Sequence, residues 1–118
     1  MYTLKQFYEA VGSDVREVLD RLGGNEAFVM RFLQKFASDK SFEELQTSLD
    51  SGDVETAFRA AHTLKGVCAN LGITRLFGQA SEITELLRAG GLDDARLKFP
   101  EVEHEYKHVL EALEKLND

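Results

Sequence analysis

The chain has 118 residues, 43% of them apolar, with a single cysteine and a single proline. A chain of this length forms one hydrophobic core, so we expect one domain over residues 1–118. The net charge of −7 makes nucleic acid and anionic lipid unfavourable partners, and no apolar run is long enough to span a bilayer. Because one cysteine cannot form an intrachain disulfide and the first residues do not resemble a secretory signal, we expect a cytoplasmic protein.

Two short helices are expected at the N-terminus. The first covers residues 3–11 with Thr3 as N-cap, and its apolar side chains repeat at offsets of three and four: Leu4, Phe7, Tyr8 and Val11. The second has Ser13 as N-cap and ends at Gly23-Gly24. Each carries one apolar stripe, which predicts that both pack against a larger helical body.

Two longer amphipathic helices follow. Asn25 is the expected N-cap of the first, which continues to the glycine at position 52, with a possible bend near Ser38-Asp39. Asp53 is the expected N-cap of the second, which covers residues 54–71 and ends at a glycine. At 1.5 Å per residue this second helix is about 27 Å long.

Two further helices complete the chain. Thr74 is the expected N-cap of the first, which ends at the flexible residues 89–91. The last helix begins near Asp93 and contains Pro100, so it is either kinked there or regular only from the proline onward. No segment alternates with the period of a strand. The pattern predicts an all-α fold, an antiparallel four-helix bundle with the short N-terminal helices packed over one end.

Within residues 54–71, small and apolar side chains repeat at alternating offsets of four and three, which predicts the face buried in the bundle: Ala57, Ala61, Leu64, Cys68 and Leu71. His62 follows Ala61 and is therefore rotated about 100° away from that face, toward solvent. Lys65 and Gly66 lie on the same side as His62, one turn later. Cys68 is expected to be a packed and unreactive thiol.

Gly66 is an unusual residue in this setting. In a helix interior, glycine costs about 1 kcal/mol relative to alanine, and the packing pattern does not require it. The missing side chain leaves space through which a phosphoryl group or another protein can approach His62. Lys65 places an ammonium beside the ring, where it can balance the charge of an incoming phosphoryl group. These residues favour a nucleophilic ring beside an anion-binding charge, an arrangement that suits the capture of a phosphoryl group at His62.

The sequence AAHTLKGVCANLG, residues 60–72, resembles the signature of the histidine phosphotransfer (HPt) family. The resemblance extends over most of the chain, and it implies a four-helix bundle that carries phosphoryl groups without using ATP. It implies that His62 is the phospho-accepting residue, that Lys65 stabilises charge and that Gly66 keeps the site accessible. The implied partners are response-regulator receiver domains, a hybrid histidine kinase, or both; no cofactor is expected.

Many members of the family place a long polar residue beside the histidine from the following helix. The aligned position here is Thr84, and Gln79 lies more than one turn before it. The resemblance therefore does not decide whether either residue contributes to the site. A free-standing monomer is expected.

Two alternatives remain open. The last helix contains Glu101, His104, Glu105 and His108, and glutamate–histidine pairs at this spacing bind metals in di-iron bundles. Here the pairs occur on one helix only, so we expect a solvated polar face and no metal site. The second alternative is a degenerate HPt domain that acts only as an adaptor, which the intact His62 and Lys65 disfavour.

Overall fold

The computed structural model describes residues 1–117, which form seven helices and no strand. The helices are α1 (Leu4–Ala10), α2 (Val15–Arg21), α3 (Glu26–Ala37), α4 (Ser41–Ser51), α5 (Val54–Leu71), α6 (Thr74–Arg88) and α7 (Leu92–Asn117). The predicted all-α fold class is therefore confirmed. None of these helices is both long and apolar enough to cross a membrane.

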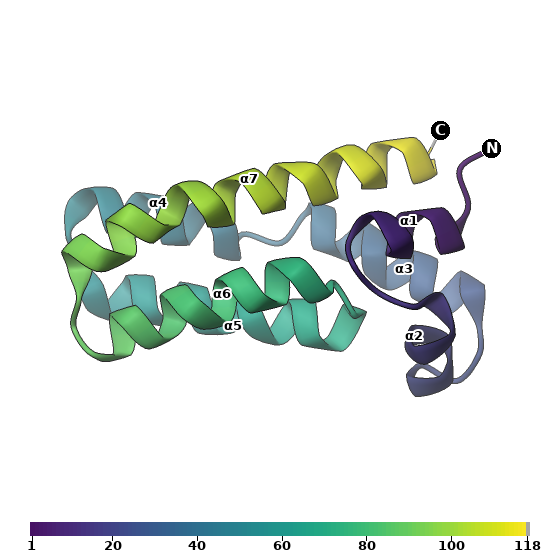
Figure 1. Ribbon diagram of the computed structural model, residues 1–118, viewed down its shortest axis with the longest axis horizontal. Helices are drawn as coiled ribbons and strands as arrows, with labels where there is room; N and C mark the ends of the chain where they lie inside the picture. Colours follow the sequence, from purple (N-terminus) through teal and green to yellow (C-terminus); the bar gives the residue numbers. More distant parts are fainter. Residues whose placement is uncertain (118) are drawn as a thin grey trace.

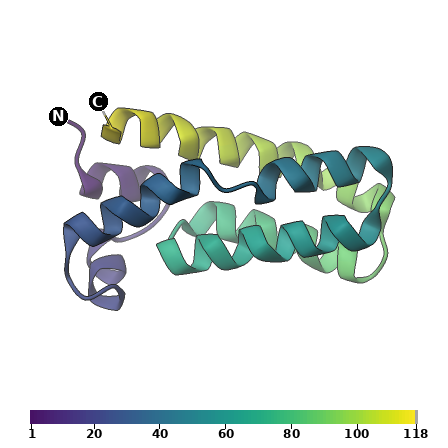
Figure 2. The ribbon, with the colours of Figure 1, turned by 180° about the vertical axis from the view of Figure 1, so that it is seen from behind.

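Helices α4, α5, α6 and α7 lie side by side along the long axis of the molecule (Figures 1 and 2), which measures 41 × 25 × 20 Å. Each short link between them reverses the direction of the chain. The most extensive packing is between α5 and α6, followed by α4 with α5 and α6 with α7. Helix α5 thus lies between two neighbours, and only part of its circumference faces solvent.

The expected helix over residues 26–51 is divided into α3 and α4 by a short break (Figure 2), close to the bend that the sequence allowed. The amides of Ser38 and Asp39 make tight-turn hydrogen bonds to Lys35 and Phe36, 3.1 Å each. The Asp39 carboxylate then accepts a hydrogen bond of 2.9 Å from the Ser41 amide. This bond satisfies a free donor at the start of α4 and lets the chain begin a new helix.

Three of the predicted N-caps are confirmed, at Thr3, Asn25 and Asp53. The predictions for Ser13 and Thr74 are wrong. Asp14 caps α2 by accepting from the Arg16 amide at 2.9 Å, and Ile73 occupies the cap position before α6. The Ser13 hydroxyl instead bonds the Gly72 carbonyl and the Thr74 hydroxyl, so both side chains make a tertiary contact in place of a cap.

Helix α7 runs through Pro100 without interruption. It begins at Leu92, so the alternative in which the regular helix starts at the proline is wrong. Proline has no amide hydrogen, which leaves one carbonyl of the preceding turn without its usual helical donor. The acidic Asp93 and Asp94 lie in the first turn, where negative charge is favourable to the helix dipole.

The predicted inward face of α5 is buried, and four of its five members are at most 1% exposed: Ala57, Ala61, Leu64, Cys68 and, at 5%, Leu71. The two alanines are small enough for neighbouring helices to approach closely. Across the core, the rings of Phe42 and Tyr106 stack with their centroids 4.0 Å apart, joining α4 to α7. This packing fixes the rotation of α5 about its own axis.

The short helices α1 and α2 pack at the end of the bundle where α5 turns into α6, as predicted (Figure 1). The buried Tyr8 hydroxyl donates to the Leu71 carbonyl at 2.8 Å. The Arg75 amide donates to Val11 at 3.2 Å, which adds a backbone contact from α6. These bonds hold the N-terminal segment on the bundle beyond its apolar contacts.

Candidate functional site

His62 lies in the middle of α5 and is exposed, while the preceding Ala61 is fully buried. The rotation of about 100° between successive helical residues separates these two environments. The ring therefore projects from a rigid element with both neighbouring turns hydrogen-bonded. An imidazole in this position is accessible to a second protein. The backbone does not have to rearrange for that protein to reach the ring.

Phe58 lies one turn before His62, and the centroids of the two rings are 6.0 Å apart. On its other side, the guanidinium carbon of Arg88 is 4.9 Å from the centroid of Phe58. Arg88 belongs to α6 and also pairs with Glu85 at 3.2 Å. The structure thus places a cation, an aromatic ring and an imidazole next to one another, in this order, on one surface of α5 and α6.

Sequence reasoning did not identify Arg88 as a neighbour of this surface. The signal was available in the antiparallel pairing of α5 and α6, because Phe58 and Arg88 lie at nearly equal distances from the turn at residues 72–73. Helical periodicity relates residues of one helix only. A contact between two helices requires their register, which the tertiary structure supplies.

Lys65 and Gly66 lie one turn after His62. Lys65 is half-buried and makes no ion pair with any residue that the structure describes. Gly66 is exposed, and a Cβ added to it would have no atom within 4 Å. The surface beyond the imidazole is therefore open on this side, with an ammonium group nearby on the same helix.

Neither of the two candidate residues on α6 hydrogen-bonds His62. Thr84 is fully buried, and its hydroxyl donates to the Ala80 carbonyl at 2.6 Å. Gln79 lines a hollow toward α7 together with Pro100 and His104. Helix α6 therefore places the guanidinium of Arg88 near the site. Among residues 1–117, neither Thr84 nor Gln79 donates a hydrogen bond to His62.

Two of the four residues of the metal-binding alternative make contacts with other helices. Glu105 forms an ion pair with Arg75 at 2.6 Å, and a ring nitrogen of His108 is 2.9 Å from the Ala10 carbonyl oxygen. Residues 1–117 contain no group of three or more acidic, histidine or cysteine side chains arranged to hold a metal ion. Glu105 therefore joins α7 to α6 and His108 contacts the end of α1, while Glu101 pairs with Lys98 of its own helix and His104 is exposed.

Cys68 is fully buried on the inner face of α5. Burial raises the pKa of its thiol to about 12, so the thiolate does not form at neutral pH. A thiol without access to solvent or an ionised form is a poor nucleophile. These observations agree with the expected packing role of Cys68.

Comparison with protein families finds a match to the Hpt domain over residues 31–115. Searches of curated proteins and of solved structures find no match. The matched residues extend from α3 into α7 and contain His62, Lys65 and Gly66. Helices α1 and α2 precede the matched part of the chain.

Proposed function

Because this chain belongs to the Hpt domain family, we propose that His62 accepts a phosphoryl group from the aspartate of one receiver domain and passes it to another. Family membership supports a role in two-component signalling as a phosphocarrier. The observation that carries the assignment to His62 is the exposure of its ring in the middle of α5, on the open side that Gly66 leaves.

The transfer needs little from this protein beyond a correctly presented ring. A ring nitrogen with a free lone pair attacks phosphorus, and the nitrogen–phosphorus bond forms as the phosphorus–oxygen bond to the aspartate breaks. The aspartate leaves as a carboxylate and retains the electron pair of the broken bond. The Lys65 ammonium balances the charge of the phosphoryl oxygens, and Gly66 leaves room for the receiver.

The partners in this proposal are response-regulator receiver domains, a hybrid histidine kinase, or both. The sequence has no glycine-rich phosphate-binding loop, so ATP is not the expected phosphoryl donor. We place the protein in the cytoplasm as a monomer, where one face of α5 must stay free for both partners. Sedimentation equilibrium at several protein concentrations should give the mass of one chain at each of them.

The assignment is tested by incubating the protein with a radiolabelled, phosphorylated receiver domain. We expect an acid-labile, base-stable label that is absent from His62→Gln. His104→Gln is the matched control, because His104 is also exposed but lies on α7, and it should be labelled like the wild type. Label that persists in His62→Gln would refute the assignment. An unlabelled wild-type protein that still binds receivers would favour the adaptor alternative.

The same assay examines Lys65. Lys65→Ala should slow transfer at least tenfold while the circular dichroism spectrum is unchanged, because the variant removes a charge near the phosphoryl group without opening the core. Lys107→Ala removes a lysine of the exposed surface of α7 and serves as the control. Equal transfer rates for the two variants would exclude the role proposed for Lys65.

A further inference from the structure

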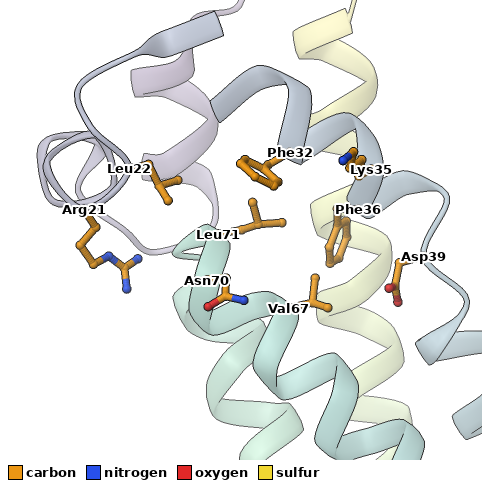
Figure 3. Close-up of a pocket in the computed structure, with 9 residues that line it drawn as sticks. All are labelled: Arg21, Leu22, Phe32, Lys35, Phe36, Asp39, Val67, Asn70 and Leu71. Carbon is orange, nitrogen blue, oxygen red and sulfur yellow. The ribbon is translucent and has the colours of Figure 1, made fainter. Parts of the chain in front are cut away.

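A pocket of about 580 Å³ lies where α2, α3 and α5 meet (Figure 3). Its lining residues are Arg21, Leu22, Phe32, Lys35, Phe36, Asp39, Val67, Asn70 and Leu71. This volume falls within the range of about 300–1,000 Å³ that is usual for small-molecule sites. The pocket is separate from the surface formed by Phe58, His62 and Arg88, none of which lines it.

The interior of the pocket is apolar. Phe36 and Leu71 are buried, and Leu22, Phe32 and Val67 are half-buried around them. In Figure 3 the side chains of Phe32 and Leu71 lie close together near the centre, with Leu22 to their left. A compact apolar group placed there would remove part of these side chains from water, and burial of apolar surface favours binding.

Two cations border this apolar interior, Arg21 on one side of the view in Figure 3 and Lys35 on the other. Neither forms an ion pair with a described residue, although the chain as a whole carries a net charge of −7. Asp39 also lines the pocket and forms no ion pair with Lys35. Arg21 also borders a neighbouring hollow that Glu17 and Asp20 line, but it forms no ion pair with either carboxylate.

Arg21 retains the capacity to bind an anion. One of its terminal nitrogens donates to the Ala69 carbonyl at 3.1 Å, which anchors the side chain on α5. A guanidinium has five N–H donors, so others remain for a carboxylate or sulfonate. Asn70, the residue after Ala69, adds an exposed amide to the same rim.

We propose that this pocket binds a small amphipathic anion, with its acidic group on Arg21 and its apolar part against Leu22, Phe32 and Leu71. The site is distinct from the proposed phosphotransfer site and does not depend on that function. The ligand class follows from an apolar interior with an anchored, unpaired guanidinium at its edge.

The probe for the test is 8-anilino-1-naphthalenesulfonate, which joins a sulfonate to an apolar ring system and fluoresces when its surroundings become apolar. We expect saturable binding to the folded protein at neutral pH. Amide shifts in ¹H–¹⁵N spectra should centre on Leu22, Phe32, Val67 and Asn70. The neutral analogue N-phenyl-1-naphthylamine should bind at least tenfold more weakly, since it lacks the group that Arg21 holds.

Three variants sharpen the test. Arg21→Gln should raise the dissociation constant at least fivefold, while Arg21→Lys, which keeps the charge, should retain most of the affinity. Arg16→Gln is the matched control, because it removes an exposed arginine of the same helix that does not line the pocket. Its affinity should equal that of the wild type, and circular dichroism verifies the fold of each variant.

Several results would overturn the proposal. They are the absence of saturable binding, amide shifts centred outside the pocket, equal affinity for the neutral analogue, and equal losses in Arg21→Gln and Arg16→Gln. Sedimentation that shows self-association through Leu22, Phe32 and Val67 would also overturn it, because a second copy of the chain would then occupy the pocket.

Discussion

The environment of His62 is determined by its position in the helical repeat. Ala61 and Leu64 are buried on either side of it in the sequence, and they hold the face of α5 that contains them against the bundle. The exposed ring then points in the remaining direction, together with Phe58 and Lys65. Single substitutions can consequently alter the exposed face without disturbing the core.

The variant Gly66→Ala distinguishes the effect of residue 66 on access to His62 from its effect on the stability of the fold. A Cβ at position 66 meets no atom within 4 Å, so the variant should unfold with a free energy up to about 1 kcal/mol higher, as expected for alanine in a helix. Transfer from a phosphorylated receiver should nevertheless slow about tenfold, because the methyl group occupies the approach to His62. Urea unfolding and transfer kinetics measure the two effects.

Gly78→Ala is the control, since Gly78 is also a helical glycine with no atom within 4 Å of an added Cβ, but lies on α6. It should show a similar gain in stability with an unchanged transfer rate. If Gly66→Ala transfers as fast as Gly78→Ala, steric access at position 66 does not limit the reaction.

The buried thiol of Cys68 should make the folded protein less stable at alkaline pH. Burial raises the pKa of its thiol from 9.0 to about 12, so the folded state keeps a proton that the unfolded state releases above about pH 9. Its contribution to stability is complete below pH 9 and decreases as the pH rises toward 12.

The free energy of unfolding of the wild type should therefore fall more steeply between about pH 8.5 and pH 10.5 than that of Cys68→Ala, in urea titrations. Tyr8, whose pKa is also raised by burial, is common to both proteins and cancels in the comparison. Parallel curves would show that the thiol has no part in the alkaline loss.

At the scale of helices, two of the links between helices depend on a glycine in the left-handed region. The turn between α5 and α6 uses Gly72 at φ +71°, and the link between α6 and α7 uses Gly90 at φ +79°. Both are in the left-handed region that favours glycine. They differ in their surroundings, because only Gly72 is covered by another helix.

Gly72→Ala should be the more damaging of the two substitutions. A Cβ there would overlap with Val18 Cγ2, so α2 would have to move away from the turn. A Cβ at Gly90 meets no atom within 4 Å. Backbone strain should lower the free energy of unfolding by about 1–2 kcal/mol in both Gly72→Ala and Gly90→Ala. The overlap with Val18 should lower it by a further ~1–3 kcal/mol in Gly72→Ala. Chemical denaturation of both variants measures the difference, and equal losses would show that α2 adjusts freely.

At the scale of the whole molecule, α1 and α2 form a cover over one end of the bundle. Both precede the residues that match the family, and both are too short to be stable alone. Their contacts with α5 and α6 connect residues about 60 positions apart, as in the bonds of Tyr8 to Leu71 and of Ser13 to Gly72. These contacts also complete the pocket that α2 shares with α3 and α5.

Tyr8→Phe tests how strongly this cover is attached. The substitution removes a buried hydrogen bond of 2.8 Å and leaves the Leu71 carbonyl without that partner, which should lower the free energy of unfolding by about 1–2 kcal/mol. Tyr2→Phe removes a hydroxyl that donates to Gln6 at 3.3 Å on the exposed surface and should change it by less than about 0.5 kcal/mol. Thermal unfolding of the two variants should differ, and equal midpoints would contradict the proposed attachment.

The sequence by itself determined the helices, apart from the break between α3 and α4, and it determined the buried face of α5 and the exposure of His62. These features depend on periodicity and on capping chemistry, which are local properties of the chain. The same reasoning failed at Ser13 and Thr74, because their hydroxyls bond each other across a tertiary contact that no local pattern contains. It also left the path of α7 through Pro100 undecided, where packing outweighs the lost helical bond.

Only the tertiary structure decided which side chains of different helices meet. The register of α5 against α6 brings Arg88 to Phe58, and it buries Thr84, whose hydroxyl bonds within its own helix. The placement of α2 beside α3 and α5 creates the pocket bordered by Arg21. These arrangements depend on how complementary surfaces fit between segments far apart in the chain, whereas helical spacing relates only residues a few positions apart.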